Sequence, residues 1–287
     1  MGERAKGIGC ILGSAFGFAL MAMFVRLCDD FGAPISSFQK SFFRNLLALA
    51  IALGVFCAHH RRSEAGGRKP KCWGLVLLRS VLGTIGIFAN FYALSHIPIA
   101  EGQTLNKTAP FFTVIFAWLF LGERANLRQF GALALAFAGV LLIVKPGFAG
   151  SSAFPLAMGL LGGLCAGAAY TCVRQLGIRK VEGAFIILFF SAFSCLASVP
   201  FMLCHFDPMT LGQVLSLLGA GLGAAIGQFG ITAAYRYAAP RSIAVFDYTN
   251  ILFTAAFGWM LFAQIPDVWS LAGFALVISA AATLFLL

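Results

Sequence analysis

The stretch AWLFLGE at residues 117–123 returns as GWMLFAQ at residues 258–264, 141 positions later in the chain. At the same offset Asn106 corresponds to Asp247. Because this offset is about half of the 287 residues, it indicates a chain made of two related halves. Each half holds an odd number of apolar segments, so the second half must enter a bilayer from the opposite side. The repeat therefore predicts an inverted pair of helical units.

Apolar residues dominate the composition. Hydrophobic residues make up 60% of the chain and charged residues 10%, with a mean hydropathy of +0.92, which leaves too little polar surface for a water-soluble globule. Ten apolar segments have the roughly 18–22 residues needed to cross the hydrocarbon core. They run over 7–28, 36–58, 74–94, 100–121, 128–145, 156–174, 184–204, 212–235, 242–263 and 269–287. The predicted fold is an all-α polytopic membrane protein with ten transmembrane helices, divided into inverted five-helix repeats at 1–147 and 148–287.

Glycines recur at every fourth position in the first segment of each half. They are Gly9, Gly13 and Gly17 in the first half and Gly159, Gly163 and Gly167 in the second. Small residues allow transmembrane helices to approach closely, so both sets are predicted to be packing faces. The sequence GLGAAIGQFG at 221–230 lies inside an apolar segment, and we interpret its glycines as packing residues rather than as a nucleotide-binding loop.

The basic residues predict an orientation. With a cytoplasmic N-terminus, 14 of the 20 Lys and Arg fall on inner loops and helix ends, namely Arg4, Lys6, Arg61, Arg62, Arg68, Lys69, Lys71, Arg124, Arg128, Arg174, Arg179, Lys180, Arg236 and Arg241. The positive-inside bias then places both termini in the cytoplasm. We interpret the basic loop at 61–71 as a solvated segment that holds this orientation, and we expect no nucleic-acid partner. The expected location is the plasma membrane, with a bacterial inner membrane favoured.

Motifs of enzyme chemistry are absent from the sequence. It contains no HExxH, no GxxxxGK[ST] and no GxSxG, and its four histidines lie in loops or at helix ends. The eight cysteines show no paired spacing and are interpreted as small packing residues. We therefore expect no enzymatic activity, no catalytic residue, no cofactor and no bound metal.

A few polar side chains fall inside the apolar segments, where each charge costs at least about 2.5–3.5 kcal/mol. Such residues usually face a wet cavity or a partner, and we take them as candidates for solute binding. The candidates are Arg44, Arg79, Asn90, Gln103, Asn106, Lys107 and Asp247. Lys40 and Arg44 share one helix face, and either they face the cavity or they snorkel to the outer headgroups. The fourth and ninth segments are repeat mates, so their polar stripes are predicted to meet near the pseudo-two-fold axis.

Depth along each helix predicts two layers of charge. Counting from the helix ends places Lys40, Arg44 and Lys107 in an outer layer, and Arg79 with Asp247 in an inner layer where they could form an ion pair. The excess of buried cations over one deep acid favours an anionic or zwitterionic solute. Asp247 is also a candidate for coupling to a proton or another ion.

Two tyrosines accompany these charges. Tyr248 adjoins Asp247 deep in the ninth segment, and Tyr170 lies in the sixth, so both are candidates to line a solute site through ring face and hydroxyl. Packing within the helix bundle is the alternative role for each of them.

The segment FYALSHIPIAEGQTLNKTAPFFTVIFAWLFLGER at 91–124 resembles the signature of the EamA-type branch of the drug/metabolite transporter superfamily. The resemblance covers essentially the whole chain, and Arg44 stands where that family often carries an arginine. It departs in the second half, where Gln264-Ile265 replaces the Glu-Arg ending and Asp247-Tyr248 replaces Asn106-Lys107. The resemblance implies ten helices, cytoplasmic termini and a central cavity lined by the first, third, fourth, sixth, eighth and ninth spans.

These observations predict a secondary active transporter that moves a small organic metabolite by alternating access. An amino acid or related compound is one example of the solute expected. The partners expected are that solute, the lipid bilayer and a proton or other coupling ion, and the protein is expected to be a monomer or homodimer. A flippase for a lipid headgroup or lipid-linked phosphate is the first alternative. A membrane receptor or scaffold that does not transport is the second.

Overall fold

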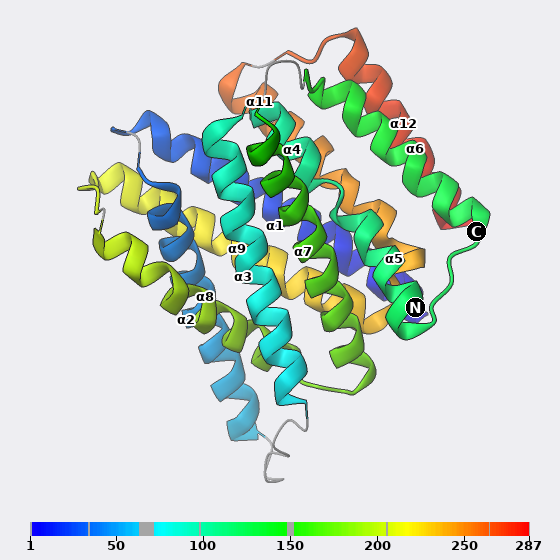
Figure 1. Ribbon diagram of the computed structural model, residues 1–287, viewed down its shortest axis with the longest axis horizontal. Coiled ribbons are helices and arrows are strands. Elements are labelled where there is room, and N and C mark those ends of the chain that lie inside the picture. The colour runs from blue at the N-terminus through cyan, green and yellow to red at the C-terminus, as the bar shows by residue number, and fades with distance from the viewer. Residues whose placement is uncertain are drawn as a thin grey trace.

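The computed structural model describes residues 2–33, 35–62, 72–97, 99–147, 152–204, 206–263 and 265–286. It contains α1 (Glu3–Asp30), α2 (Ser37–Arg62), α3 (Trp73–His96), α4 (Ile99–Asn106), α5 (Ala109–Leu121), α6 (Leu127–Val144), α7 (Ala153–Ile178), α8 (Gly183–Cys204), α9 (Leu211–Tyr237), α10 (Pro240–Ile243), the 3₁₀ helix η1 (Ala244–Tyr248), α11 (Thr249–Phe262) and α12 (Val268–Leu286). They make up ten apolar spans, as predicted from the sequence. The fourth span is divided into α4 and α5, and the ninth into α10, η1 and α11 (Figure 1).

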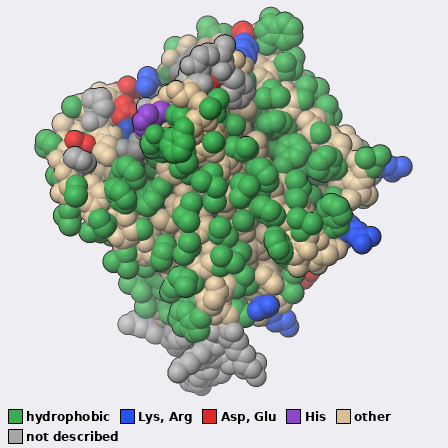
Figure 2. Space-filling view, viewed as in Figure 1, with side chains coloured by type: hydrophobic (Ala, Val, Ile, Leu, Met, Phe, Trp, Pro, Cys, Tyr) green, Lys and Arg blue, Asp and Glu red, His purple; other side chains and the backbone are tan. Residues whose placement is uncertain are grey.

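The outer surface carries large apolar side chains of the kind that face lipid. Phe120, Leu196 and Leu203 are each 73% exposed. Figure 2 shows hydrophobic side chains spread over the visible face, with Lys and Arg at its margins. A helix satisfies its own backbone hydrogen bonds, so it can present such a surface to hydrocarbon. The chain is a multi-pass membrane protein.

The helices of the two halves pair in a symmetric pattern. The most extensive contacts join α1 to α9 and α3 to α7, followed by α6 with α12 and α2 with α8. Since α1 and α7 are repeat mates, as are α3 and α9, exchanging the halves converts the first pairing into the second. The contacts therefore follow the pseudo-two-fold axis that an inverted repeat requires.

Glycines allow the pair of α1 and α9 to approach closely. A Cβ added at Gly17 would lie 2.6 Å from the backbone nitrogen of Gly227, and Ser14 Oγ donates a 2.8 Å hydrogen bond to the Gly227 carbonyl. The packing role predicted for the glycines at 221–230 is thus confirmed. The prediction for Gly9 and Gly13 was wrong, because no atom of the described residues lies within 4 Å of a Cβ built there.

The second glycine set behaves as predicted and packs on the fourth span. A Cβ at Gly159 would meet Leu105, one at Gly163 would meet Thr108, and one at Gly167 would meet Phe112. This face of α7 therefore lies against the point where the fourth span is interrupted.

The turns after the fourth and ninth spans share one backbone design. Gly122 and Ala263, 141 positions apart, end α5 and α11 in the left-handed region with φ of 71° and 51°. Asn126 then caps α6, and the equivalent Asp267 accepts a hydrogen bond from the backbone three residues later, at the start of α12. The repeat seen in the sequence is thus also present in the backbone of the connecting turns. The predicted division between 147 and 148 adjoins residues 148–151, which lie outside the described residues.

Two faces of the bundle can now be distinguished. The terminal face carries both chain ends, marked N and C in Figure 1, with the turns from α5 to α6, α7 to α8 and α9 to α10. The opposite face carries the turns from α1 to α2, α8 to α9 and α11 to α12. Most of the predicted basic loop at 61–71 lies outside the described residues.

Candidate functional site

The fourth span is interrupted at Lys107 and Thr108, between α4 and α5. Pro110, two residues after Thr108, has no N–H to continue the helical ladder, while Thr108 Oγ1 donates to the Leu105 carbonyl at 2.6 Å. The N–H of Phe111, four residues after Lys107, donates to the Thr108 carbonyl at 3.0 Å, which leaves the carbonyl of Lys107 available for a partner outside its own span.

The ninth span is interrupted at the equivalent depth. The short helix α10 begins at Pro240 and gives way to the 3₁₀ turn η1, which contains Asp247 and Tyr248, before α11 resumes at Thr249. Interrupted helices of this kind expose backbone and polar groups at the centre of many transporters.

The two interruptions touch each other. Lys107 Nζ donates a 2.7 Å hydrogen bond to Asn250 Oδ1, and Tyr248 Oη donates to the Lys107 carbonyl at 3.0 Å. Asn250 in turn donates to the carbonyl of Ala15 on α1 at 2.9 Å. Asp247 is close enough for its charge to act on Lys107. The predicted meeting of the two polar stripes is confirmed.

Arg79 on α3 is buried, with 2% of its surface exposed. Its Nη2 donates to Gln228 Oε1 on α9 at 3.2 Å, and its guanidinium lies 3.7 Å from the centre of the Phe190 ring. Gly83 provides the room, because a Cβ there would collide with the guanidinium. The Nε of Arg79 is buried and finds no hydrogen-bond partner among the described residues.

The predicted ion pair between Arg79 and Asp247 was wrong. Arg79 contacts Gln228 instead, and the charge of Asp247 acts on Lys107. The depth count assumed an unbroken helix, whereas the ninth span reaches Asp247 through a four-residue helix and a 3₁₀ turn. The two predicted layers of charge therefore do not describe the structure.

Arg44 on α2 and Tyr170 on α7 complete the centre. Arg44 is half-buried and directs Nη1 toward Met21 Sδ at 3.4 Å, while its buried Nε has no hydrogen-bond partner in the described ranges. Tyr170 lies within electrostatic range of Arg44, Arg79 and Asp247. Its ring packs against that of Tyr235 on α9, with the ring centroids 5.6 Å apart.

We call these eight residues the central cluster: Arg44, Arg79, Lys107, Tyr170, Gln228, Asp247, Tyr248 and Asn250. They come from the second, third, fourth, sixth, eighth and ninth spans, and Ala15 adds the first. Gln228 and Phe190 were not predicted as site residues. The sequence signal that could have identified Gln228 was that it carries the one amide side chain in the glycine-rich stretch at 221–230.

The remaining predicted residues lie around the cluster. Asn106 is the half-buried last residue of α4, and Asn90 on α3 is half-buried with Oδ1 lacking a partner. Gln103 is exposed. Lys40 forms an ion pair with Asp29 at the opposite face, which places it at the helix ends rather than in the cluster.

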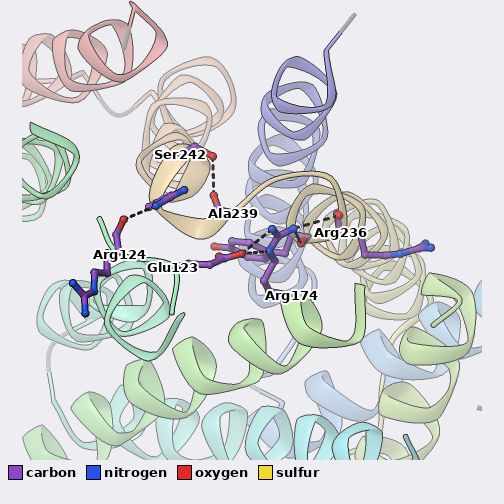
Figure 3. Close-up of polar contacts among 8 residues, drawn as sticks. Glu123, Arg124, Arg174, Arg236, Ala239 and Ser242 are labelled. Carbon is purple, nitrogen blue, oxygen red and sulfur yellow. Dashed lines mark hydrogen bonds and ion pairs between the residues drawn. The ribbon is translucent and has the colours of Figure 1, made fainter. Parts of the chain in front are cut away.

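On the terminal face the halves are joined by an ion pair and backbone contacts, drawn in Figure 3. Glu123 Oε1, at the end of α5, accepts hydrogen bonds from Arg174 Nε at 2.9 Å and from Nη2 at 2.8 Å. Arg174 Nη1 also donates to the Tyr235 carbonyl at 3.2 Å, and Arg241 donates to the Arg124 carbonyl at 2.6 Å. Two connections therefore join the halves at this face.

On the opposite face, the halves are joined around Asp207. Its Oδ2 accepts from the backbone N–H of Ser36 at 2.8 Å, and its backbone forms two 2.9 Å hydrogen bonds with the Gln39 amide. The central cluster thus lies between two sets of contacts that join the halves.

A polytopic bundle of inverted halves, with interrupted helices meeting at a buried polar cluster, defines a membrane transport protein rather than an enzyme. The model of the EamA-like transporter family matches residues 5–145. The pseudopaline exporter CntI of Pseudomonas aeruginosa is 30% identical over 269 residues, covering 93% of this chain and 91% of the relative. The chain belongs to the EamA-like transporter family, in the drug/metabolite transporter superfamily.

Other matches agree with this membership. A riboflavin transporter of Brucella anthropi is 28% identical over 254 residues, covering 86% of this chain and 87% of that protein. A solved crystal structure superimposes with a TM-score of 0.80 over 96% of this chain and 97% of its own, at 16% identity, and so supports the fold.

Proposed function

We propose that the protein is a secondary active transporter that moves a small anionic or zwitterionic organic metabolite across the bacterial inner membrane by alternating access. The relatives named as an exporter and as a riboflavin transporter support a solute of this size class. The two halves, residues 1–147 and 148–287, would rock about the axis where Lys107 and Tyr248 meet.

The observation that carries the solute class is the charge of the central cluster. Arg44, Arg79 and Lys107 contribute three cations, and Asp247 is the one acid among the eight residues. Arg79 is 2% exposed and is stabilised by an amide and an aromatic face rather than by a carboxylate. A buried guanidinium without an acid is costly, and a carboxylate or phosphate on the solute would offset that cost.

The contacts at the two faces support alternating access. Separation of Glu123 from Arg174 would open the terminal face, and separation of Asp207 from Gln39 would open the other. By the positive-inside rule the terminal face is cytoplasmic, because it carries Arg124, Arg174 and most of the other basic residues. Asp247, half-buried beside Lys107, is the candidate group for coupling to a proton.

A ligand screen followed by counterflow tests this function. Purified protein is first screened by thermal shift against a panel of amino acids, organic acids and nucleotide-like compounds, since a specific ligand stabilises the folded state. Proteoliposomes loaded with each hit should then accumulate the labelled hit from outside, and Arg79→Gln should abolish this while Arg128→Gln, on the surface of α6, should not. Stabilisation without counterflow would indicate a receptor, and movement of labelled lipid alone would indicate a flippase.

A further inference from the structure

A hollow of about 400 Å³ opens on the terminal face, where the start of α1, the turn before α6 and the turn before α10 come together. Its wall includes Arg4 from α1, Arg124 and Asn126 from the turn before α6, and Arg241 from α10. Arg4 and Arg124 belong to the first half and Arg241 to the second. The hollow is distinct from the central cluster and shares no residue with it.

Four side chains of this hollow, Arg4, Asn126, Gln129 and Arg241, offer free hydrogen-bond donors. The side-chain oxygens of Asn126 and Gln129 are used in a mutual cap, accepting from each other's backbone N–H at 2.8 and 3.1 Å, which leaves both NH₂ groups available. Arg4 Nε is buried and has no hydrogen-bond partner within the part of the chain that the structure describes. Arg241 uses one N–H for the Arg124 carbonyl and retains others.

The charged side chains that line the hollow are all positive. Neither Asp nor Glu is among the described residues that line it, and Glu123, next to Arg124, is bound by Arg174. Three guanidinium groups with free N–H donors match the acceptor oxygens of a phosphate. A zwitterionic headgroup would bring an ammonium that no carboxylate of the wall could meet.

Exposed apolar side chains flank the hollow. Leu127 and Phe130, at the start of α6, are 88% and 42% exposed, and Phe285 and Leu286, at the end of α12, are 60% and 86% exposed. Arg4 joins this end of α12 to the hollow by donating to the carbonyls of Leu284 and Phe285. Phosphate-binding groups beside apolar surface suit the headgroup and acyl chains of a lipid better than a soluble phosphate.

We propose that this hollow binds the phosphate headgroup of an anionic phospholipid from the leaflet at the terminal face. The bound phosphate bridges Arg124 and Arg241, which lie on different halves, and so stabilises the closed state of this face. The lipid is a resident ligand and not the transported solute, so the inference does not depend on the proposed transport function.

Native mass spectrometry of the full-length protein in detergent tests the site with phosphatidylglycerol and phosphatidylcholine of identical acyl chains. We expect preferential binding of phosphatidylglycerol, and a loss of its affinity by about tenfold or more in the Arg124→Gln/Arg241→Gln double variant. Arg128→Gln is the matched control, because Arg128 is an exposed arginine at the start of α6 that does not line the hollow.

Three outcomes would overturn the proposal. They are equal binding of the two lipids, an equal loss in Arg128→Gln, and displacement of phosphatidylglycerol by inorganic phosphate or glycerol phosphate at similar concentration, which would assign the hollow to a soluble phosphate. Should the double variant not fold, Arg124→Gln alone replaces it in the test, because the Arg124 side chain is exposed. We expect this single variant to lose part of the selectivity for phosphatidylglycerol.

Discussion

Tyr248 donates a hydrogen bond to the backbone carbonyl of Lys107, and these two residues are repeat mates 141 positions apart. Equivalent positions of two inverted repeats can touch only on the axis that relates the repeats. The bond therefore marks the pseudo-two-fold axis, and it joins the interruption of the fourth span to that of the ninth. In the proposed rocking motion, the two halves would move relative to each other about this contact.

Tyr248→Phe removes this hydrogen bond and keeps the ring. Tyr248 has no exposed surface, so the Lys107 carbonyl loses its partner, and we expect the protein to lose about 0.5–1.5 kcal/mol of stability. Thermal unfolding in detergent measures the loss. Tyr237→Phe is the control, because Tyr237 is 44% exposed at the end of α9, and an equal shift in both variants would contradict the role of the bond.

Lys107→Ala should abolish transport while leaving the amount of folded protein within about twofold of wild type. The ammonium donates to Asn250 and lies near Asp247, so its removal leaves Asp247 as an uncompensated charge on the axis. Uptake and export assays, with membrane abundance measured in parallel, distinguish the outcomes. Arg128→Ala should change neither transport nor membrane abundance. Normal transport by Lys107→Ala would show that Lys107 is not part of the solute site.

The fold was predictable because its determinants can be read directly from the order of the residues. Apolar length specifies the ten spans, the 141-residue offset specifies the repeat, and Pro110 is visible beside the interruption of the fourth span. The partner of Arg79 was not predictable, because it depends on the path of the ninth span. No proline within Ala244–Tyr248 announces the 3₁₀ turn, so counting along an ideal helix assigned Asp247 the wrong neighbours.

The packing predictions show the same limit. Glycine spacing correctly identified the face of α7 that meets the fourth span, yet the same spacing in α1 gave Gly9 and Gly13, which face nothing within 4 Å. Periodicity identifies a face but not the helix that covers it. Gln228 was missed for a related reason, since its role arises only when α9 packs beside α3.

Glu123→Gln should loosen the terminal face, because it weakens the two charge-assisted hydrogen bonds from Arg174. The native Cys172, 7% exposed and two residues before Arg174, reports on this opening. With the other seven of the eight cysteines replaced, its labelling by a water-soluble maleimide should accelerate severalfold. Asp207→Asn on the opposite face should not accelerate it, and equal rates in wild type and Glu123→Gln would contradict the closing role.

The ion pair of Lys145 with Asp267 should tolerate mild acid. The hydrogen bond from Lys145, with further bonds from the backbone and hydroxyl of Ser270, lowers the pKa of Asp267 to about 2. A carboxylate whose pKa is lower in the folded state than the unfolded value of about 3.9 stabilises the fold above that value. That contribution is lost as the pH falls from about 4 through 2.

The effect of Asp267→Asn on melting temperature should thus be the same at pH 7 and pH 5. It should be small, because the two side chains are 44% and 49% exposed. Asp30→Asn, an exposed acid at the end of α1, is the control. Disappearance of the Asp267→Asn effect between pH 7 and pH 5 would contradict the lowered pKa.

Double-mutant cycles should separate the partners of Asp247. The charge of Asp247 acts on Lys107, so Lys107→Met and Asp247→Asn should couple, with an interaction free energy of about 0.5–3 kcal/mol. The double variant should therefore lose less stability than the sum of the losses in the two single variants. Arg79→Gln and Asp247→Asn share no contact and should add within about 0.3–0.5 kcal/mol. Both cycles are read from thermal unfolding of purified protein. If Arg79 rather than Lys107 coupled to Asp247, the arrangement of charges described for the central cluster would be wrong.

The same variants test coupling by Asp247. If this carboxylate carries the coupling proton, Asp247→Asn should abolish accumulation driven by a proton gradient and spare solute exchange, because exchange returns the carrier loaded and needs no net proton movement. Accumulation and counterflow are compared in the same proteoliposomes, with Asp30→Asn, an exposed acid at the end of α1, as the control outside the cluster. Gradient-driven accumulation at the wild-type level in Asp247→Asn would assign the residue to solute binding or to pairing with Lys107 alone.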